Sequence, residues 1–389
     1  MRDHHRAVRQ LTLRKGASRR GSLLLTVLAL ISALSCSLPG MVPATRLPET
    51  PAQPPIETSS PSAIAAPTDR VLLIATFDGE TPLVHAVDPD TGDELTTVSV
   101  PGWEKFKTIQ LAGGQIFYET DIGVRRTSPG GEADDLVFVE GRSFLPSRDG
   151  SWIAWGGCRP DPGLPACHNR IEVSRADGSE RRMVFDEEHD EPIEARPFEW
   201  SEDGRYLYLY HYNPIAAASY PFDIRRVDLE TGGVTPLLGQ GDLSDLQLSP
   251  DDSMVAYSRL GPEPRTLSLL DLTTGRETEV TLDADHRQAG GIVWAPDSSA
   301  LAITEGIGVM AREATAVVRV DLQDMRLRTL LPDDPRQLRT LLWLDENWII
   351  LGSGTGNNGG VWRLDATTGE LTHIHPGVLL GAIEAASLP

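Results

Sequence analysis

Side chains with the capacity for chemistry gather between positions 186 and 222, in two groups. The first group is an acidic run made of Asp186, Glu187, Glu188, His189, Asp190 and Glu191. Clustered carboxylates can bind a cationic ligand or Ca²⁺, but their spacing fits no EF-hand register, so a solvated loop is the alternative. The second group is Tyr210, His211, Tyr212 and Tyr220, preceded by Tyr208. Tyrosines make good binding anchors, and core packing is the competing interpretation of Tyr208 and Tyr210.

Three further patterns have weaker chemical content. Gly354, Gly356 and Gly359 match a dinucleotide-binding fingerprint, but a strand-like segment follows where a helix would be needed, so we expect a hairpin loop. His373 and His375 share one face of a predicted strand, which indicates exposed sheet surface. The sequence contains no Gly-x-Ser-x-Gly, His-Glu-x-x-His or P-loop motif. It therefore indicates no catalytic residue, and we expect neither a cofactor nor a metal.

Composition limits the kinds of partner. The 389 residues include 35 basic and 56 acidic ones, which gives a formal net charge of −21. A protein that binds a nucleic-acid backbone needs a basic excess on its binding face, so we expect no nucleic-acid partner. With 40% apolar and 23% charged residues, the chain has the composition of a globular protein.

Short strands and turns must position these residues from residue 71 onward. Runs of four to six β-branched or aromatic residues recur there, and no long segment has a helical period. Two turn signatures alternate with the runs. One is a Pro-Asp or Asp-Gly turn before a strand, and the other is Asp-x-x-Thr-Gly in the following hairpin. The first signature returns about every 46–54 residues, which is the period of a propeller-type array.

This repeat resembles the WD-like repeat of TolB-type propellers, and the blades of prolyl oligopeptidase-type enzymes look similar. The resemblance covers roughly residues 70–389 and implies an all-β, seven-bladed β-propeller. Six blades would result if residues 102–140 do not form one. Residues 71–100 supply three strands of the first blade, and we expect residues 377–385 to add the missing strand and close the ring. The similar peptidases carry a separate hydrolase domain, for which we expect no room after closure.

The two turn signatures and the irregular segments belong to opposite faces of such a ring. In blades of strands a to d, the a–b and c–d turns share one face, and the b–c and d–a loops share the other. Both signatures fall on the first face, where their shortness indicates a structural role. The irregular segments fall on the second face, at 156–169, 186–196, 211–222, 306–315 and 352–360. Variable loops on a rigid scaffold usually carry binding, so we expect the working surface there, around the channel mouth.

Residues 1–36 resemble a secretory signal that ends in a bacterial lipobox. Seven basic residues and one acid precede a short apolar run, which is shorter than the ~20 residues that span a bilayer. The segment ends in Ala33-Leu34-Ser35-Cys36, and the resemblance implies that Cys36 is acylated and becomes the mature N-terminus. An uncleaved anchor over about residues 23–42 is the alternative. Residues 37–69, rich in Pro, Ser and Thr, are expected to form an extended linker.

The two remaining cysteines, Cys158 and Cys167, bound a ten-residue segment that contains three prolines. In an exported protein this pair is best interpreted as one disulfide, which would pin the loop between them. Two free thiols are the alternative. A zinc site that includes His168 is disfavoured because a fourth ligand is missing.

The sequence thus predicts a non-catalytic, exported and lipid-anchored propeller that acts as a binding or scaffold protein of the bacterial envelope. We expect a monomer that binds a protein, a peptide or a cationic ligand on the second face. Two alternatives stay open. One is a lyase- or glycosidase-like propeller enzyme with its site at the channel mouth, and the other is a purely structural spacer.

Overall fold

The computed structural model divides the chain into two units, Met1–Ser62 and Ala63–Pro389. It describes residues 69–77, 81–103, 108–131, 134–138, 143–160, 167–215, 220–239, 241–260, 266–282, 287–307, 314–353 and 359–388. All of them belong to the second unit. The predicted signal segment 1–36 with Cys36, residues 37–68 of the predicted linker, and residues 354–358 of the glycine-rich loop lie outside the described part.

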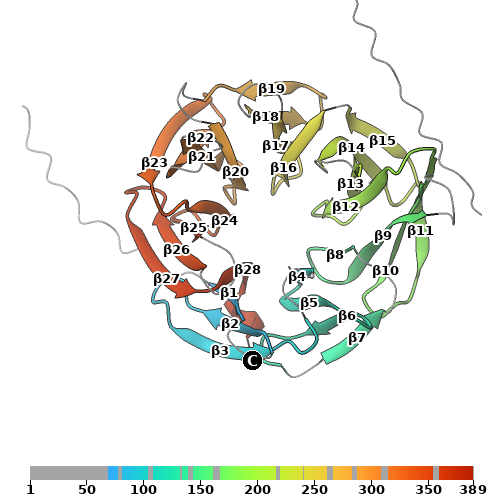
Figure 1. The fold of residues 1–389 in the computed structure, drawn as a ribbon, viewed down its shortest axis with the longest axis horizontal. Coiled ribbons are helices and arrows are strands. Elements are labelled where there is room, and N and C mark those ends of the chain that lie inside the picture. Colours follow the sequence, from blue (N-terminus) through green and yellow to red (C-terminus); the bar gives the residue numbers. More distant parts are fainter. Residues whose placement is uncertain are drawn as a thin grey trace, which may run out of the picture. The chain divides into compact units, whose positions relative to one another are not determined.

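The second unit is a ring of seven four-stranded antiparallel sheets (Figure 1). Blade 1 contains β28 (Val378–Glu384), β1 (Arg70–Thr76), β2 (Leu83–Val87) and β3 (Glu94–Ser99). Blade 2 contains β4 (Ile109–Ala112), β5 (Gln115–Thr120), β6 (Gly123–Thr127) and β7 (Asp134–Phe138). Blade 3 contains β8 (Phe144–Pro146), β9 (Trp152–Pro160), β10 (Cys167–Arg175) and β11 (Arg182–His189). Blade 4 contains β12 (Glu194–Trp200), β13 (Tyr206–Tyr212), β14 (Pro221–Asp228) and β15 (Val234–Leu238).

Three further blades complete the ring, and in each blade the first strand named is the innermost (Figure 1). Blade 5 contains β16 (Asp242–Leu248), β17 (Met254–Leu260), β18 (Thr266–Asp271) and β19 (Glu277–Val280). Blade 6 contains β20 (Arg287–Trp294), β21 (Ala300–Ile307), β22 (Ala314–Asp321) and β23 (Arg326–Asp334). Blade 7 contains β24 (Arg339–Trp343), β25 (Trp348–Ser353), β26 (Gly360–Asp365) and β27 (Leu371–Pro376). A short 3₁₀ helix, η3 (Ala385–Ser387), follows β28. No helix among the described residues is long and apolar enough to cross a membrane.

The C-terminal strand closes the ring, as predicted. β28 pairs antiparallel with β1, from Arg70 opposite Glu384 to Ala75 opposite Val378. The segment after the first blade forms the complete sheet β4–β7, so the seven-bladed prediction is confirmed and the six-bladed alternative is wrong.

The Asp-x-x-Thr-Gly signature forms the c–d turns because its aspartate caps its own backbone. In blades 1, 4, 5 and 7 the aspartate Oδ1 accepts the amide hydrogens two and three residues onward. The turn glycine takes a positive φ, for example 74° at Gly232, which a side chain would disfavour. In blade 4 a hydrogen bond from Arg205, with the amides of Glu230 and Thr231, lowers the pKa of Asp228 to about 2. These carboxylates serve the fold.

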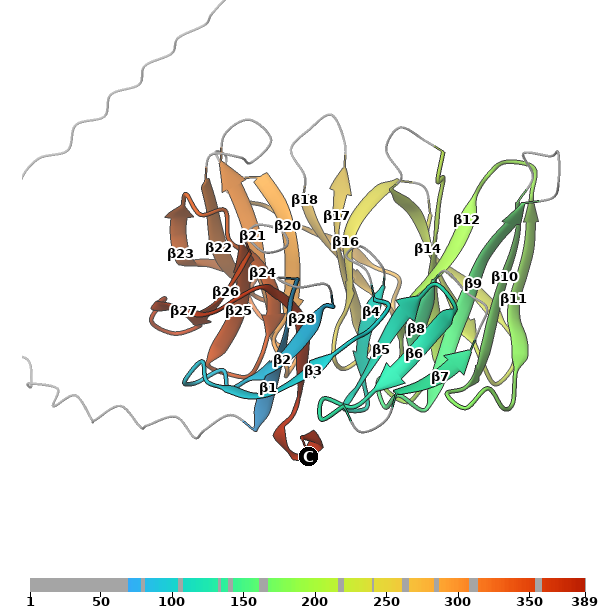
Figure 2. The same ribbon diagram turned by 60° about the horizontal axis from the view of Figure 1, so that its bottom comes forward.

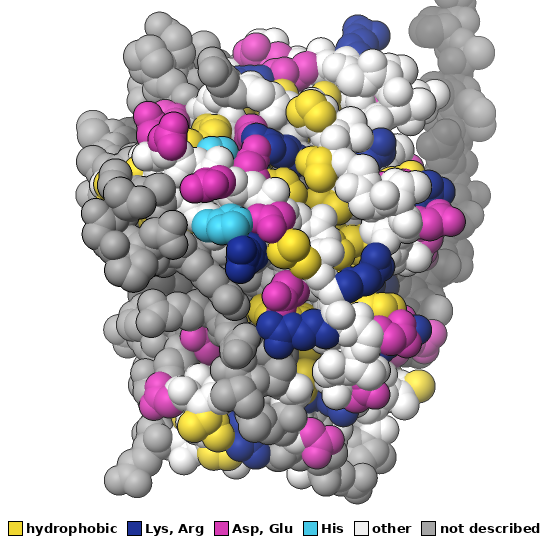
Figure 3. All heavy atoms as spheres, turned by 90° about the vertical axis from the view of Figure 1, so that its right-hand side faces the viewer, with side chains coloured by type: hydrophobic (Ala, Val, Ile, Leu, Met, Phe, Trp, Pro, Cys, Tyr) yellow, Lys and Arg dark blue, Asp and Glu magenta, His cyan; other side chains and the backbone are white. Residues whose placement is uncertain are grey.

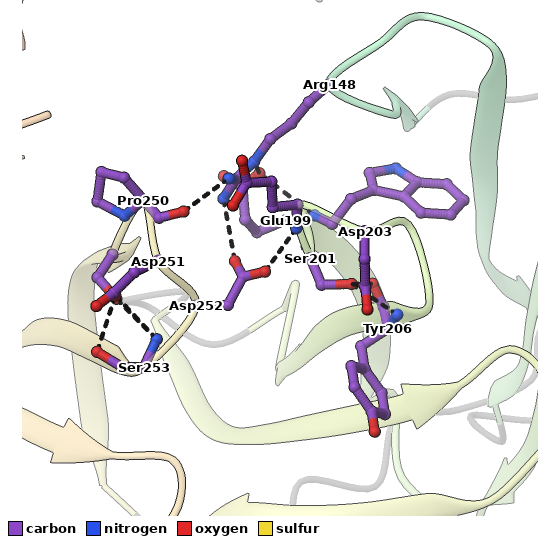
Figure 4. A network of polar contacts seen from close by, with 12 residues as sticks. Arg148, Glu199, Ser201, Asp203, Tyr206, Pro250, Asp251, Asp252 and Ser253 are labelled. Atoms are coloured by element: carbon purple, nitrogen blue, oxygen red, sulfur yellow. Dashed lines mark hydrogen bonds and ion pairs between the residues drawn. The ribbon is translucent and has the colours of Figure 1, made fainter. Parts of the chain in front are cut away.

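The a–b turns repeat a second device, which joins neighbouring blades on the same face, here called the turn face. Ser147, Ser201 and Ser249 each donate to the aspartate two residues on, at 2.6, 2.6 and 2.7 Å. Arg148 then bridges three blades. It contacts Glu199 at 3.6 Å and Asp252 at 3.3 Å (Figure 4).

Apolar side chains fill the seams between blades. One cluster joins Ala154 and Ile171 of blade 3 to Ala195, Leu207 and Leu209 of blade 4. The indole Nε1 of Trp200 in blade 4 donates to the Leu145 carbonyl of blade 3 at 3.1 Å. Packing between adjacent sheets therefore fixes how each blade meets the next.

Two predicted loops are largely strand. The acidic run was expected in a loop over residues 186–196, but β11 continues to His189, because its backbone pairs with β10 from Cys167 opposite His189 onward. Similarly, β9 and β10 extend into the segment 156–169. The strand ends that lead into the predicted irregular segments, such as those of β9, β13 and β21, lie at one end of the ring, here called the loop face, while η3 lies at the other end (Figure 2).

We predict that truncation before Gly377 sharply lowers the melting temperature. It removes β28, the innermost strand of blade 1, and with it the strand pairing that closes the ring. A loss of several kcal/mol would lower the midpoint by roughly 10 °C or more. Circular dichroism during heating measures it. A chain that stops after Glu384 is the control, because it retains β28 and loses η3, whose residues are exposed. An unchanged melting curve after truncation before Gly377 would contradict closure by this strand.

Candidate functional site

Three of the predicted site residues meet in the seam between blades 3 and 4. Glu187 and His189 lie two apart on β11, so they share one face of the strand, and His211 lies on β13. Figure 3 views the ring from the side that carries β11 in Figure 1. It shows acidic, basic and histidine side chains close together there. We call Glu187, His189, His211, Asp223 and Arg225 the seam cluster. β11 is the outermost strand of its sheet, so the cluster lies away from the predicted channel mouth.

His211 is the centre of the seam cluster and is fully buried. Its Nδ1 lies 2.7 Å from Oδ1 of Asp223, and the same oxygen accepts the backbone amide of His211 at 3.0 Å. Its Nε2 lies 3.2 Å from Oε2 of Glu187, and Nε2 of His189 lies 3.1 Å from that oxygen. The rings of Phe185 and Phe222 pack beside the imidazole.

Arg225 sets the electrostatics of the seam cluster. Its Nη1 donates to both oxygens of Glu187 at 2.9 and 3.0 Å, and its Nε donates to Asp223 at 3.2 Å. Burial works to raise the pKa of both carboxyls. The hydrogen bonds and charges of Arg225 and the neighbouring histidines outweigh it and hold the pKa of Glu187 and of Asp223 below their usual range. Both carboxylates are therefore ionised at neutral pH.

Tyr210 and Tyr212 alternate with His211 along β13 and belong to a second polar group. The Tyr212 hydroxyl donates to Glu194 at 2.8 Å, and the guanidinium of Arg196 stacks over its ring at 4.8 Å. Burial raises the pKa of Tyr210 and of Tyr212. The core-packing interpretation holds for Tyr208, which is buried in an apolar cluster, whereas Tyr210 contacts Phe198 and also lies beside these charged neighbours.

A cavity of about 280 Å³ adjoins this second group. Its lining residues are Trp155, Gly156, Gly157, Cys158, Arg170, Glu172, Glu194 and Arg196. The inner strand β8 pairs with β9 only from Trp155 back to Ile153, so the cavity lies beyond the end of that pairing, toward the loop face. Cys158 and Cys167 are joined by a disulfide with Cα atoms 5.4 Å apart, which links β9 to β10 beside the cavity.

The other predicted residues are dispersed. Asp186 contacts His168 and, at 4.0 Å, Arg170. Glu188 and Asp190 are exposed, and Tyr220 is partly buried directly before β14. The acidic run therefore does not act as one site, since strand alternation sends Asp186 and Glu187 to opposite faces.

A larger cavity of about 450 Å³ lies on the ring axis at the loop face. The inner strands of blades 5, 6, 7 and 1 line it, and its polar side chains are Asp245, Gln247, Gln337, Arg339, Thr340 and Ser353. β16, β20 and β24 all carry β-bulges here, and Asp245 and Gln337 have φ of 55° and 57°. Bulges re-aim side chains and often occur beside binding sites. Sequence reasoning missed this cavity, because nothing in the turn signatures indicates a bulge.

A second histidine cluster joins blades 7 and 1. Glu94 contacts Nε2 of His375 at 3.0 Å and Nδ1 of His85 at 3.1 Å. The prediction that His375 is exposed was wrong: only 7% of it is exposed, because β3 of the next blade covers it. His373 is exposed, as predicted, and meets the edge of Trp362.

A cavity of about 430 Å³ on the turn face is built from the turn signatures. Its lining includes Ser201, Asp203, Asp251 and Asp252. Asp203 and Asp251 are occupied by their own turns, and the amide of Glu202 donates to Asp252 at 2.6 Å (Figure 4). Burial raises the pKa of Asp252 and of Glu199. We interpret this network as structural, because its members hold blades 3, 4 and 5 together.

No family model matches the chain, and no curated protein matches it. Solved structures do match. One from a study of two prolyl endopeptidases has a TM-score of 0.58 at 14% identity and covers 79% of this chain and 48% of that chain. An oligogalacturonate lyase from Vibrio parahaemolyticus has a TM-score of 0.53 at 10% identity and covers 77% and 92%. TolB from Acinetobacter baumannii has a TM-score of 0.42 at 12% identity and covers 81% and 82%.

These likenesses show the propeller fold alone. The chain spans about half the length of the prolyl endopeptidase structure. The score for TolB is too low to support an argument about family.

We predict that Arg225→Met destabilises the protein by about 1 to 3 kcal/mol, because it leaves two partly buried carboxylates without their cation. Since the pKa values of Glu187 and Asp223 are lowered in the folded protein, this stabilisation is present above their ordinary values of about 4 and is lost as pH falls below them. Urea unfolding in the presence of a chelator measures the free energy of unfolding of the unsubstituted protein and of Arg225→Met at pH 7 and at pH 3.5. The difference between the two proteins should be smaller at pH 3.5. Glu188→Gln, on the exposed neighbour, should change stability by less than about 0.5 kcal/mol. Equal effects of the two substitutions would contradict the role of Arg225.

Proposed function

We propose that this chain is a non-catalytic binding or scaffold propeller that takes its partner at the loop face, beside the ring axis. The observation that carries the proposal is the pair of cavities at that face, one of about 450 Å³ and one of about 280 Å³, each with several polar side chains in its lining. Concave sites with a few placed polar groups are where proteins usually bind ligands.

The cavity of about 450 Å³, here called the axial cavity, suits a peptide segment that carries charge. Arg339 and Asp245 are 3.8 Å apart, with 54% and 22% of their side chains exposed. An ion pair this long and this exposed contributes little to stability, so both charges are available to a partner. Gly291, Gly352, Gly360 and Gly377 also line the cavity, so no side chain projects from the wall at these positions and the main chain of a ligand can approach closely. Main-chain hydrogen bonds and one charge of each sign are what an extended peptide presents.

Binding is favoured over catalysis by the side chains at this cavity. Its described lining holds one carboxylate, one guanidinium and no histidine. General acid–base chemistry is most often carried out by histidine, and the only carboxylate of this described lining lies beside an arginine. The two histidine clusters of the described chain lie in blade seams formed with outermost strands, away from the axis.

We propose in addition that the propeller is exported and tethered by lipid at Cys36, on the outer side of the bacterial cytoplasmic membrane or at the cell surface. The basic, apolar and small-residue order of residues 1–36 supports this. The disulfide between Cys158 and Cys167 supports it independently, since disulfides persist in oxidising compartments.

We predict that a photo-crosslinking amino acid in place of Leu341 captures a discrete partner in living cells. Leu341 lines the axial cavity and is 43% exposed. Val234, also 43% exposed, follows the c–d turn of blade 4 on the turn face and is the matched control position. Adducts on denaturing gels, with the full chain expressed in its host, measure capture. Arg339→Ala combined with the probe at position 341 should reduce the adduct at least several-fold.

Equal adducts from positions 341 and 234 would contradict a partner at the loop face. An adduct at position 341 that does not change with Arg339→Ala would contradict recognition by the axial cavity. Absence of any adduct at position 341 would count against the binding proposal.

We predict that the mature protein begins at an acylated Cys36. Mass spectrometry of the N-terminal peptide should show a diacylglyceryl thioether on this cysteine, and Cys36→Ser should lose the lipid and leave the precursor uncleaved. Recovery of an unmodified Cys36 inside a chain that still carries residues 1–35 would support the uncleaved anchor instead and overturn the lipid tether.

A further inference from the structure

The seam cluster has the composition and placement of a metal site. Glu187 and His189 of blade 3 and His211 of blade 4 each offer one ligand atom, and these three atoms lie within 4.8 Å of one another. Two imidazoles with one carboxylate form a donor set that suits zinc and similar divalent transition metals.

Asp223 fixes which nitrogen of His211 faces the other two residues. Its Oδ1 is 2.7 Å from Nδ1 of His211 and also accepts the backbone amide of His211, so Nδ1 carries the hydrogen of that short contact. A carboxylate that holds the outer nitrogen of a histidine in this way is the usual support of a metal-binding imidazole. The Nε2 atom of His211 then points into the cluster.

That nitrogen is buried, and it makes no hydrogen bond. It nevertheless lies 3.2 Å from Oε2 of Glu187. A nitrogen lone pair against a carboxylate oxygen is repulsive in a buried site, so a proton or a cation must lie between them. Because Nε2 of His189 approaches the same oxygen at 3.1 Å, one cation could satisfy all three ligand atoms.

The spacing agrees with a bound ion. Bonds of about 2.0–2.2 Å to zinc place the ligand atoms of a tetrahedron roughly 3.3–3.5 Å apart. The two distances to Oε2 of Glu187, 3.1 and 3.2 Å, need only a small adjustment to match. His189 and Glu187 are 20% and 30% exposed, which leaves a route for the ion and for a water as fourth ligand.

Charge also permits a cation. Glu187 and Asp223 supply two negative charges, and Arg225, which contacts both, supplies one positive charge. The seam therefore keeps a net charge of −1 before any ion binds. Arg225 holds Glu187 in place, and its charge moderates the affinity.

The second histidine cluster, at the seam of blades 7 and 1, provides an internal comparison. It too consists of two histidines and a glutamate, His85, His375 and Glu94. There every ring nitrogen has a partner: His85 contacts Thr76, Thr97 and Glu94, and His375 contacts Glu94 and the Pro376 carbonyl. This cluster is a completed hydrogen-bond network, whereas the seam cluster leaves Nε2 of His211 without a hydrogen bond.

We propose that Glu187, His189 and His211 hold one divalent transition-metal ion, with zinc as the expected occupant, which cross-links blades 3 and 4. This inference goes beyond the proposed binding function and does not depend on it, because the seam cluster lies away from the axial cavity.

Zinc titration of the metal-free protein tests the proposal. The full chain is stripped with a chelator, dialysed and titrated with ZnCl₂ in a calorimeter. We expect one tight site per chain and a rise in melting temperature on binding. His211→Gln and Glu187→Gln should each lower the affinity for zinc by 10-fold to 100-fold. Cobalt in place of zinc should give the visible absorption of a tetrahedral site, and His211→Gln should abolish it.

His85→Gln and His375→Gln are the matched controls, and both should retain the tight site. His189→Gln, at the partly exposed ligand, tests the site if His211→Gln does not fold. Absence of a tight site, or a site that survives both His211→Gln and His189→Gln, would overturn the proposal. Loss of zinc binding through His375→Gln alone would also overturn it, because the ion would then lie at the other seam.

Discussion

The pairing of β28 with β1 is the constraint on which the other contacts depend. It joins residues about 300 positions apart in the chain and turns seven separate sheets into a closed ring. Closure leaves each blade with a neighbour on both sides, so the apolar seams can be buried all the way around. It also holds β28 on the axis, where Val378 and Leu379 complete the wall of the axial cavity.

The seams between blades divide into apolar interiors and polar ends. At the turn face, the repeated serine and aspartate turns satisfy their own backbone. Arg148, in the turn of blade 3, contacts Pro250 and Asp252 in the turn of blade 5 and Glu199 on β12 of blade 4 (Figure 4). Toward the outer strands, the seam of blades 3 and 4 departs from this pattern by burying His211 between Asp223 and Glu187. Burying charged groups is costly unless they are paired, and here Arg225 pairs with both carboxylates.

The inner strands pair irregularly where they line the axial cavity. β16, β20 and β24 all bulge where they line it, and Asp245 and Gln337 adopt a backbone conformation that side chains disfavour. Such conformations persist where the surrounding structure holds them, and they concentrate at binding sites. The rigid outer sheets thus support an irregular inner wall, which suits recognition of a partner better than it suits stability.

The sequence alone determined the propeller and the closing strand, because a local turn code repeated at a fixed interval leaves few other folds. It favoured seven blades and left six open, since residues 102–140 are the most irregular copy, and only the complete sheet β4–β7 decided the number. It also identified Glu187, His189 and His211, since polar and aromatic residues in an otherwise regular repeat are conspicuous. Only the tertiary structure decided which of them meet. Strand alternation separates His211 from Tyr210 and Tyr212, and blade packing supplies Asp223 and Arg225. Contacts such as Glu94 with His375, 281 residues apart, arise from ring closure, which no local pattern encodes.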